Sequence, residues 1–253
     1  MAVAEGLTAV NGYGRWIYAL GLWGHVLYQY DTKGGDVRRI EVGSVGGHMS
    51  RNFIVDHQGH AYAPRLRQLG EAEAADRPWS TPRLVATLVQ FDTDLREIGE
   101  TPLDHYAEPE KPSRSHGIIS FTDLADGSVV FATHMGALYR ITPRNGGPSA
   151  VEFIGWFDPF DRAYSPSLFT FAGTRFVVGL VRKSRHKSRL FQWVVYDLEA
   201  GGSKAIDFPY TAPRLLLYGS ATRDNAGRFY IVGRRQSDQS DRLRPTLLRV
   251  EVP

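Results

Sequence analysis

The sequence predicts an all-β protein, a β-propeller of four-stranded antiparallel blades with about five blades in this chain. Aromatic residues make up 12% of the 253 residues, and 26 Gly and 14 Pro favour short strands and tight turns over helices. An apolar or aromatic pair followed by Asp or a turn recurs roughly every 50 to 60 residues, the size of one blade. A hairpin with a Gly turn precedes each copy.

The recurring phrase is interpreted as the third strand of each blade. It alternates in polarity, as a strand with one buried face does. In three copies a Gly-containing turn leads into a further strand, which would be the fourth. The copies are LYQYDTKGG (27–35), LVQFDTDL (88–95), LYRITPRNGG (138–147), WVVYDLEAGG (193–202) and LLRVEV (247–252).

The blades follow one another within a single domain. Their predicted limits are 7–45, 46–104, 115–158, 162–209 and 213–253. Four of these blades are complete, and the fifth has three strands. Residues 1–6 are a candidate closing strand for the last blade. In the alternative, the chain is part of a larger ring, and blade five should then have an unpaired outer strand edge.

Two segments interrupt this order, and several polar residues lie beside turns. Residues 66–83 form a polar insertion with a predicted short helical turn, and residues 104–115 form a loop that leads into the third blade. Asp31, Asp92 and Asp197 end the recurring strand, where we expect bonds from side chain to turn backbone. His57 and His60 flank Gly59 and are expected at the surface.

The central hairpin, SHGIISFTDLADGSVVFATHM (115–135), carries His116 and His134 at its two open ends, so we expect them side by side. In a propeller such ends converge at one opening. Other polar residues fall at equivalent ends, and we predict that they bind substrate. They are His48, Arg51, Asn52, Arg65, Tyr164 and Arg182.

This combination of Arg, His and Tyr suits β-elimination on a uronic-acid sugar. Arg clamps a carboxylate and acidifies the neighbouring C–H bond. A neutral His or Tyr takes that proton and returns one to the leaving oxygen. The sequence therefore predicts binding of an acidic carbohydrate, with eliminative cleavage by a carbon–oxygen lyase.

The paired-His hairpin, with His116, the Asp126-Gly127 turn and His134, resembles that of propeller-type polysaccharide lyases acting on uronate polymers, the ulvan lyases among them. In that family a Tyr and an Arg from another hairpin complete the site. Tyr218 and Arg234 occupy comparable positions. The resemblance therefore implies a catalytic set of His116, His134, Tyr218 and Arg234.

The alternative function is a non-catalytic propeller that docks a protein or glycan through Trp23, Tyr164 and Tyr218. No cofactor is expected, although His48, His116 and His134 are a weaker candidate site for a divalent metal. The chain has no Cys for disulfides or thiolate sites.

Composition also indicates which classes of partner and which compartments are expected. The basic residues are scattered outside 182–189 and the net charge is only +3, so a nucleic-acid partner is not expected. No apolar run is long enough to span a membrane. The N-terminal residues do not have the pattern of a signal peptide, which leaves the cytoplasm, or secretion from a longer precursor, as the compartment.

Overall fold

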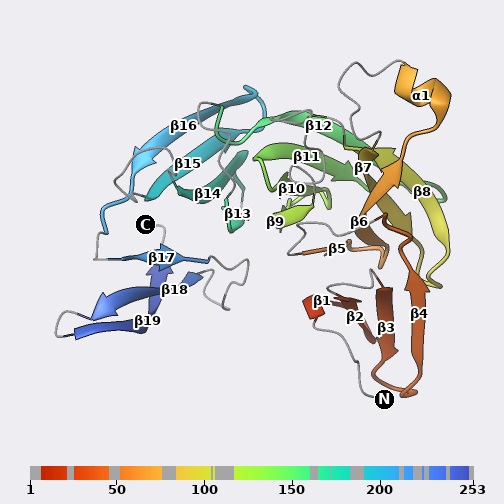
Figure 1. Cartoon of the computed structure of the whole chain (residues 1–253), viewed down its shortest axis with the longest axis horizontal. Helices are drawn as coiled ribbons and strands as arrows, with labels where there is room; N and C mark the ends of the chain where they lie inside the picture. The colour runs from red at the N-terminus through yellow and green to blue at the C-terminus, as the bar shows by residue number, and fades with distance from the viewer. Residues whose placement is uncertain are drawn as a thin grey trace.

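The computed structural model describes residues 7–21, 26–45, 52–75, 84–103, 105, 117–159, 165–171, 173–182, 191–210, 214–218, 224, 228–237 and 240–250. These residues form five antiparallel sheets that follow one another around an arc (Figure 1). The predicted all-β propeller is therefore confirmed.

The sheets contain the following elements. Blade one has β1 (Leu7–Tyr13), β2 (Trp16–Gly21), β3 (Val26–Asp31) and β4 (Val37–Glu41). Blade two has β5 (Ile54–Val55), β6 (Ala61–Gln68), β7 (Leu84–Phe91) and β8 (Glu97–Pro102), with α1 (Glu71–Ala75) between β6 and β7. Blade three has β9 (Ile118–Asp123), β10 (Val129–Thr133), β11 (Ala137–Thr142) and β12 (Ala150–Trp156). Blade four has β13 (Leu168–Thr170), β14 (Phe176–Arg182), β15 (Phe191–Asp197) and β16 (Gly202–Asp207). Blade five has β17 (Leu216–Leu217), β18 (Phe229–Ser237) and β19 (Ser240–Val250).

Within each sheet the strands lie in sequence order, four in blades one to four and three in blade five, as predicted. The helical turn expected in the polar insertion is also present, as α1. The candidate closing strand, residues 1–6, lies outside the described residues.

The core lies between the blades. Each of the four contacts between successive blades contains a cluster of buried apolar side chains from both sheets. Representative pairs are Leu20 with Phe53, Tyr62 with Phe131, Leu138 with Leu168, and Leu180 with Ile231. Among the described residues, no such cluster joins blade five to blade one.

The Asp residues that end the third strands hold the turns that follow. Asp31, Asp92 and Asp197 each accept a hydrogen bond at Oδ1 from the backbone N–H two residues later, at 2.9, 2.9 and 3.0 Å. This confirms the predicted turn bonds. Because the same bond recurs in three blades, the Asp in the recurring phrase is explained by turn geometry.

The first hairpin turn of blade two is built on the buried carboxylate of Asp56. The Tyr62 hydroxyl donates to Asp56 Oδ2 at 2.6 Å, and Ser149 Oγ of the neighbouring blade lies 2.8 Å from the same hydroxyl. Burial and the adjacent carboxylate raise the pKa of Tyr62. His57 is exposed as expected, but the prediction for His60 was wrong. Its side chain is only 15% exposed, with Nδ1 3.5 Å from Asp56 Oδ2.

We predict that Gly179→Ala destabilises the fold. A Cβ at this position in β14 would meet the Ser165 Oγ, lie 2.8 Å from the Ser167 carbonyl oxygen and 2.9 Å from Phe157 Cζ. The free energy of unfolding, measured by urea denaturation, should fall by about 1–3 kcal/mol. Gly202→Ala in β16 is the matched control, because no atom lies within 4 Å of its Cβ position. Equal losses in the two variants would contradict this packing.

Candidate functional site

The second strands of the blades end on one face of the propeller, which we call the mouth face. Because the blades share one strand order, equivalent strand ends lie on the same face. His134 follows the end of β10, Arg182 ends β14, and Arg234 lies near the end of β18. The turns between first and second strands lie on the opposite face, which we call the turn face.

Four of the predicted site residues lie outside the described residues. They are His48, Arg51, His116 and Tyr164. Trp23, predicted as part of a docking surface, also lies there. The juxtaposition of His116 with His134 therefore stays a prediction.

Asn52 and Arg65 both make contacts within the protein. The Asn52 side-chain amide donates to the carbonyl of Ile119 at 2.6 Å, and so ties blade two to blade three. The Arg65 guanidinium pairs with Glu97 at 2.6 Å and lies 3.4 Å from Glu100. The positive charge of Arg65 is thus balanced by carboxylates of its own blade.

Tyr218 and Arg234 share one face of blade five. The Tyr218 N–H donates to the Val232 carbonyl at 2.8 Å, and Arg234 stands two residues further along the same strand. This face points away from blade four, because Leu217 and Ile231 on the opposite face pack against blade four. No hydrogen bond or ion pair between described residues joins Tyr218, Arg234 and His134 to one another.

Two further arginines lie at the mouth-face end of blade five, on the side toward blade four. Arg235 and Arg244 are directly opposite each other in the ladder of β18 and β19. They share the sheet face of Ile231 and Leu248, which packs against blade four. Like charges in such a cross-strand pair repel each other.

Arg182 lies at the mouth-face end of blade four. It lies two residues after Leu180, whose side chain packs against blade five, and so it projects toward that blade. Its Nε is buried, and no described group accepts a hydrogen bond from it. We call Arg182, Arg235 and Arg244 the arginine cluster. An anion bound between them would relieve their mutual repulsion.

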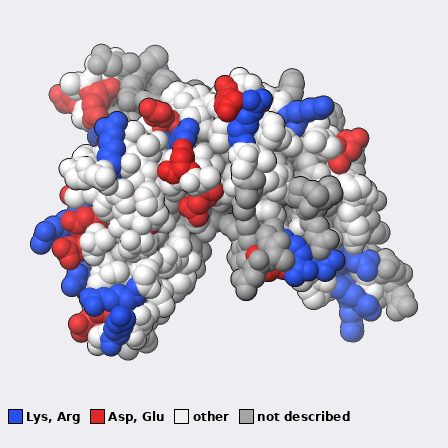
Figure 2. Space-filling model, turned by 180° about the vertical axis from the view of Figure 1, so that it is seen from behind, with Lys and Arg blue, Asp and Glu red and all other residues white. Residues whose placement is uncertain are grey.

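Blade five as a whole is basic. Residues 214–250 contain eight Arg and three Asp, whereas the entire chain has a net charge of only +3. Figure 2 shows Lys and Arg side chains gathered at the blade-five end of the molecule. This concentration, which a scan for runs of basic residues misses, favours an acidic partner.

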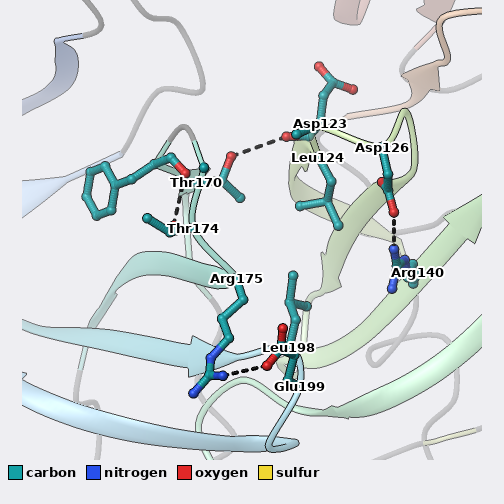
Figure 3. A pocket seen from close by; sticks show the side chains of 12 residues that line it. Asp123, Leu124, Asp126, Arg140, Thr170, Thr174, Arg175, Leu198 and Glu199 are labelled. Atoms are coloured by element: carbon teal, nitrogen blue, oxygen red, sulfur yellow. Dashed lines mark hydrogen bonds and ion pairs between the residues drawn. The ribbon is translucent and has the colours of Figure 1, made fainter.

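A cavity of about 490 Å³ opens on the turn face between blades three and four (Figure 3). The turn after β9 and the turn after β13 form its walls, and Phe171 contributes an aromatic side chain. Two ion pairs line it, Arg140 with Asp126 and Arg175 with Glu199. The cavity therefore combines an aromatic ring with charges that are already paired.

The carboxylate of Asp126 is held in its charged form. A hydrogen bond from the Ser128 hydroxyl lowers the pKa of Asp126, and although partial burial opposes this, the charge of Arg140 adds to it. A hydrogen bond to Glu199, with the charge of Asp197, raises the pKa of Arg175. Asp126 is thus a poor proton donor near neutral pH, and the cavity suits a neutral polar ligand better than acid catalysis.

Within the described residues, no group of three or more His, Asp or Glu side chains could hold a metal ion. His48 and His116 are not among those residues, so the predicted three-His site is untested. No helix in the described part of the chain is long and apolar enough to cross a membrane.

Comparisons with known proteins support the fold alone. No protein-family profile matches the chain, and no curated protein does. Among solved structures it is similar to a complex of KlAtg21 with the coiled coil of AgAtg16, at 12% identity and a TM-score of 0.54. It is also similar to the Dos1 propeller and to a PL25 ulvan lyase, both at 12% identity and a TM-score of 0.53.

These matches cover most of this chain but only part of the other structures. They cover 90, 97 and 97% of this chain, and 66, 58 and 69% of the KlAtg21, Dos1 and ulvan lyase chains. The chain thus spans about two-thirds or less of the first two and slightly more of the third. The three are a protein complex, a propeller and a polysaccharide lyase, so at this identity the likeness establishes a propeller and no particular activity.

We predict that Asp126→Asn lowers stability in a pH-dependent way. A depressed carboxyl pKa contributes stability that is present above the pKa of the unfolded chain and is lost as pH falls through the folded-state pKa. The variant should lose at most about 1 kcal/mol at neutral pH, because the partly exposed pair is screened. Urea denaturation at falling pH should show the two proteins converging. A difference that stays constant with pH would contradict this.

Proposed function

We propose that this protein binds an acidic polysaccharide or oligosaccharide at the mouth face, with the arginine cluster as the centre for the anionic groups. The observation that carries the proposal is the position of three arginines at the mouth-face ends of two facing sheets, on the sides that face each other. Neither Arg182 nor Arg244 forms an ion pair with any described residue. Guanidinium groups bind carboxylates and sulfates in a bidentate manner, which suits uronate and sulfated sugars.

Neighbouring features support a polymer as the ligand. The Tyr218 side chain is 43% exposed on the next surface of blade five, where an aromatic ring can stack against a sugar. Arg234 on the same surface adds a further positive charge. The similarity in fold to a polysaccharide lyase is compatible with this ligand class.

Eliminative cleavage is the finer part of the proposal. Arg234 would neutralise the uronate carboxylate, and one of His116, His134 and Tyr218 would take the proton from the adjacent carbon. The electron pair of that C–H bond then forms a carbon–carbon double bond while the glycosidic carbon–oxygen bond breaks. A second group of the set protonates the leaving oxygen.

The second candidate is a propeller that binds a protein or glycan without cleaving it. The exposed aromatic surface at Tyr218 favours it, because aromatic side chains often anchor interfaces. Such a module needs a surface and no convergence of proton-transfer groups, and this difference separates the two functions experimentally.

We expect the protein to bind polygalacturonate or alginate, and Arg182→Gln or Arg244→Gln to weaken that binding about tenfold each, since each variant loses charged hydrogen bonds. Calorimetric titration measures this. Arg144→Gln is the control, because this exposed arginine follows β11 on the turn face and removes the same charge. Equal weakening by all three variants would show that only overall charge matters and would overturn the site.

Cleavage has its own test. If the protein is a lyase, incubation with these polymers should raise the ultraviolet absorbance of unsaturated uronate, and His134→Ala should abolish the rise without abolishing binding. Binding with no rise in absorbance would reject cleavage of the tested polymers and support the binding module.

A further inference from the structure

The two ends of the arc differ from its middle in the burial of their strands. In blades two and three the central strands are buried on both faces, with seven of eight residues buried in β7 and all five in β10. In blade one, β3 instead alternates between buried and less buried positions. An interior blade has a neighbour on each side, and blade one has a described neighbour only in blade two.

The free face of blade one is nevertheless apolar. Ile17, Tyr30 and Val37 form one row across three strands, in direct register. Their exposed fractions are 40, 41 and 45%. A row of large apolar side chains in water is the composition of an interface rather than of a solvated surface.

Blade five, at the other end of the arc, also carries exposed apolar side chains on its free face. Val232 and Leu247 are directly opposite in β18 and β19, and the Tyr218 N–H bonds to Val232. These three side chains are 43–61% exposed, on the face that points away from blade four. Figure 1 places blades one and five at opposite ends of the arc.

Blade five also has a free strand edge. Its sheet has three strands where the other four blades have four, and β19 is the outermost. Within the described chain, nothing pairs with the outer edge of β19. Pro245 donates no N–H, so a further strand would pair over Thr246–Val250. An open strand edge is a template for pairing with a further strand, and the adjacent apolar face can cover part of what docks there.

We propose that the free face and edge of blade five dock a further β-sheet from an acidic polypeptide partner. Its first strand pairs antiparallel with β19, and its apolar side chains cover Val232 and Leu247. Acidic residues face the arginines of β19, since Arg242, Arg244 and Arg249 make this strand basic. The arginines argue against a second copy of the chain, because a twofold pairing of β19 would set like charges together.

The lengths of the similar structures agree with such a partner. The matches cover 90–97% of this chain but only 58–69% of the other chains, so those chains continue beyond the part that matches the five blades. The proposal does not rest on the proposed function, because strand pairing and the cover of Val232 and Leu247 need no bound anion. Those two side chains lie on the opposite face of blade five from the arginine cluster, and Arg244 is the one residue that both proposals use.

The test uses the whole protein and a labelled peptide of residues 148–158, PSAVEFIGWFD. This segment contains β12, the fourth strand of blade three, and carries two acidic residues and no basic one. Fluorescence anisotropy should show binding, and Val232→Asp should weaken it at least about tenfold. Ile17→Asp is the matched control, because it is similarly exposed on blade one and should leave binding unchanged. Circular dichroism checks that both variants fold.

Each other outcome overturns the proposal. Absence of peptide binding to the folded protein would show that the face and edge do not accept an acidic strand. Equal binding of a scrambled peptide, or equal binding by the two variants, would show that any binding is not specific to this face and edge. Analytical ultracentrifugation measures whether the protein forms a dimer, which is the remaining outcome. A dimer that Val232→Asp dissociates would assign the face to a second copy.

Discussion

The face-to-face packing of neighbouring sheets is the constraint on which the rest of this structure depends. Each interior blade buries apolar residues on both faces, and the strand that results reads as nearly continuous hydrophobic sequence, as in β7 and β10. A terminal blade has the same two-faced construction but one described neighbour. The second face of a terminal blade therefore has apolar side chains but no described sheet to cover them. This explains the exposed apolar rows at Tyr30 in blade one and at Val232 in blade five.

The same packing separates the chemistry of the two faces of the propeller. On the turn face, Asp and Arg side chains near the strand ends satisfy one another, as Asp126 and Arg140 do, and the charges are balanced locally. On the mouth face between blades four and five, Arg182 and Arg244 have no such described partner. Arginines that approach one another repel, so an anion bound between them would add stability there.

Much of the fold was predictable from sequence because its signals are local. The recurring phrase and its Asp predict strands and turns, and the bonds of Asp31, Asp92 and Asp197 bear this out. What was missed depends on register and on packing between blades. Arg235 and Arg244 are nine residues apart along the chain, and only the ladder of β18 and β19 sets them opposite each other. The His60 side chain is largely buried, and its Nδ1 lies near the distant Gln90 as well as Asp56. The pairing of Arg65 with Glu97 is equally non-local, so the site residues were less predictable than the blades.

Tyr218 and Arg234 take part in the proposed cleavage and also lie on the face where the further β-sheet would dock. Both residues lie on the face of blade five that the docked sheet would cover, whereas the arginine cluster lies on the face toward blade four. Anion binding by the cluster therefore needs only the blades described here. Proton transfer at Tyr218 depends also on the groups that a covering sheet would bring beside it. Binding of an acidic polymer should consequently persist under conditions where cleavage is absent, and occupation of the face at Val232 should change cleavage more than it changes binding.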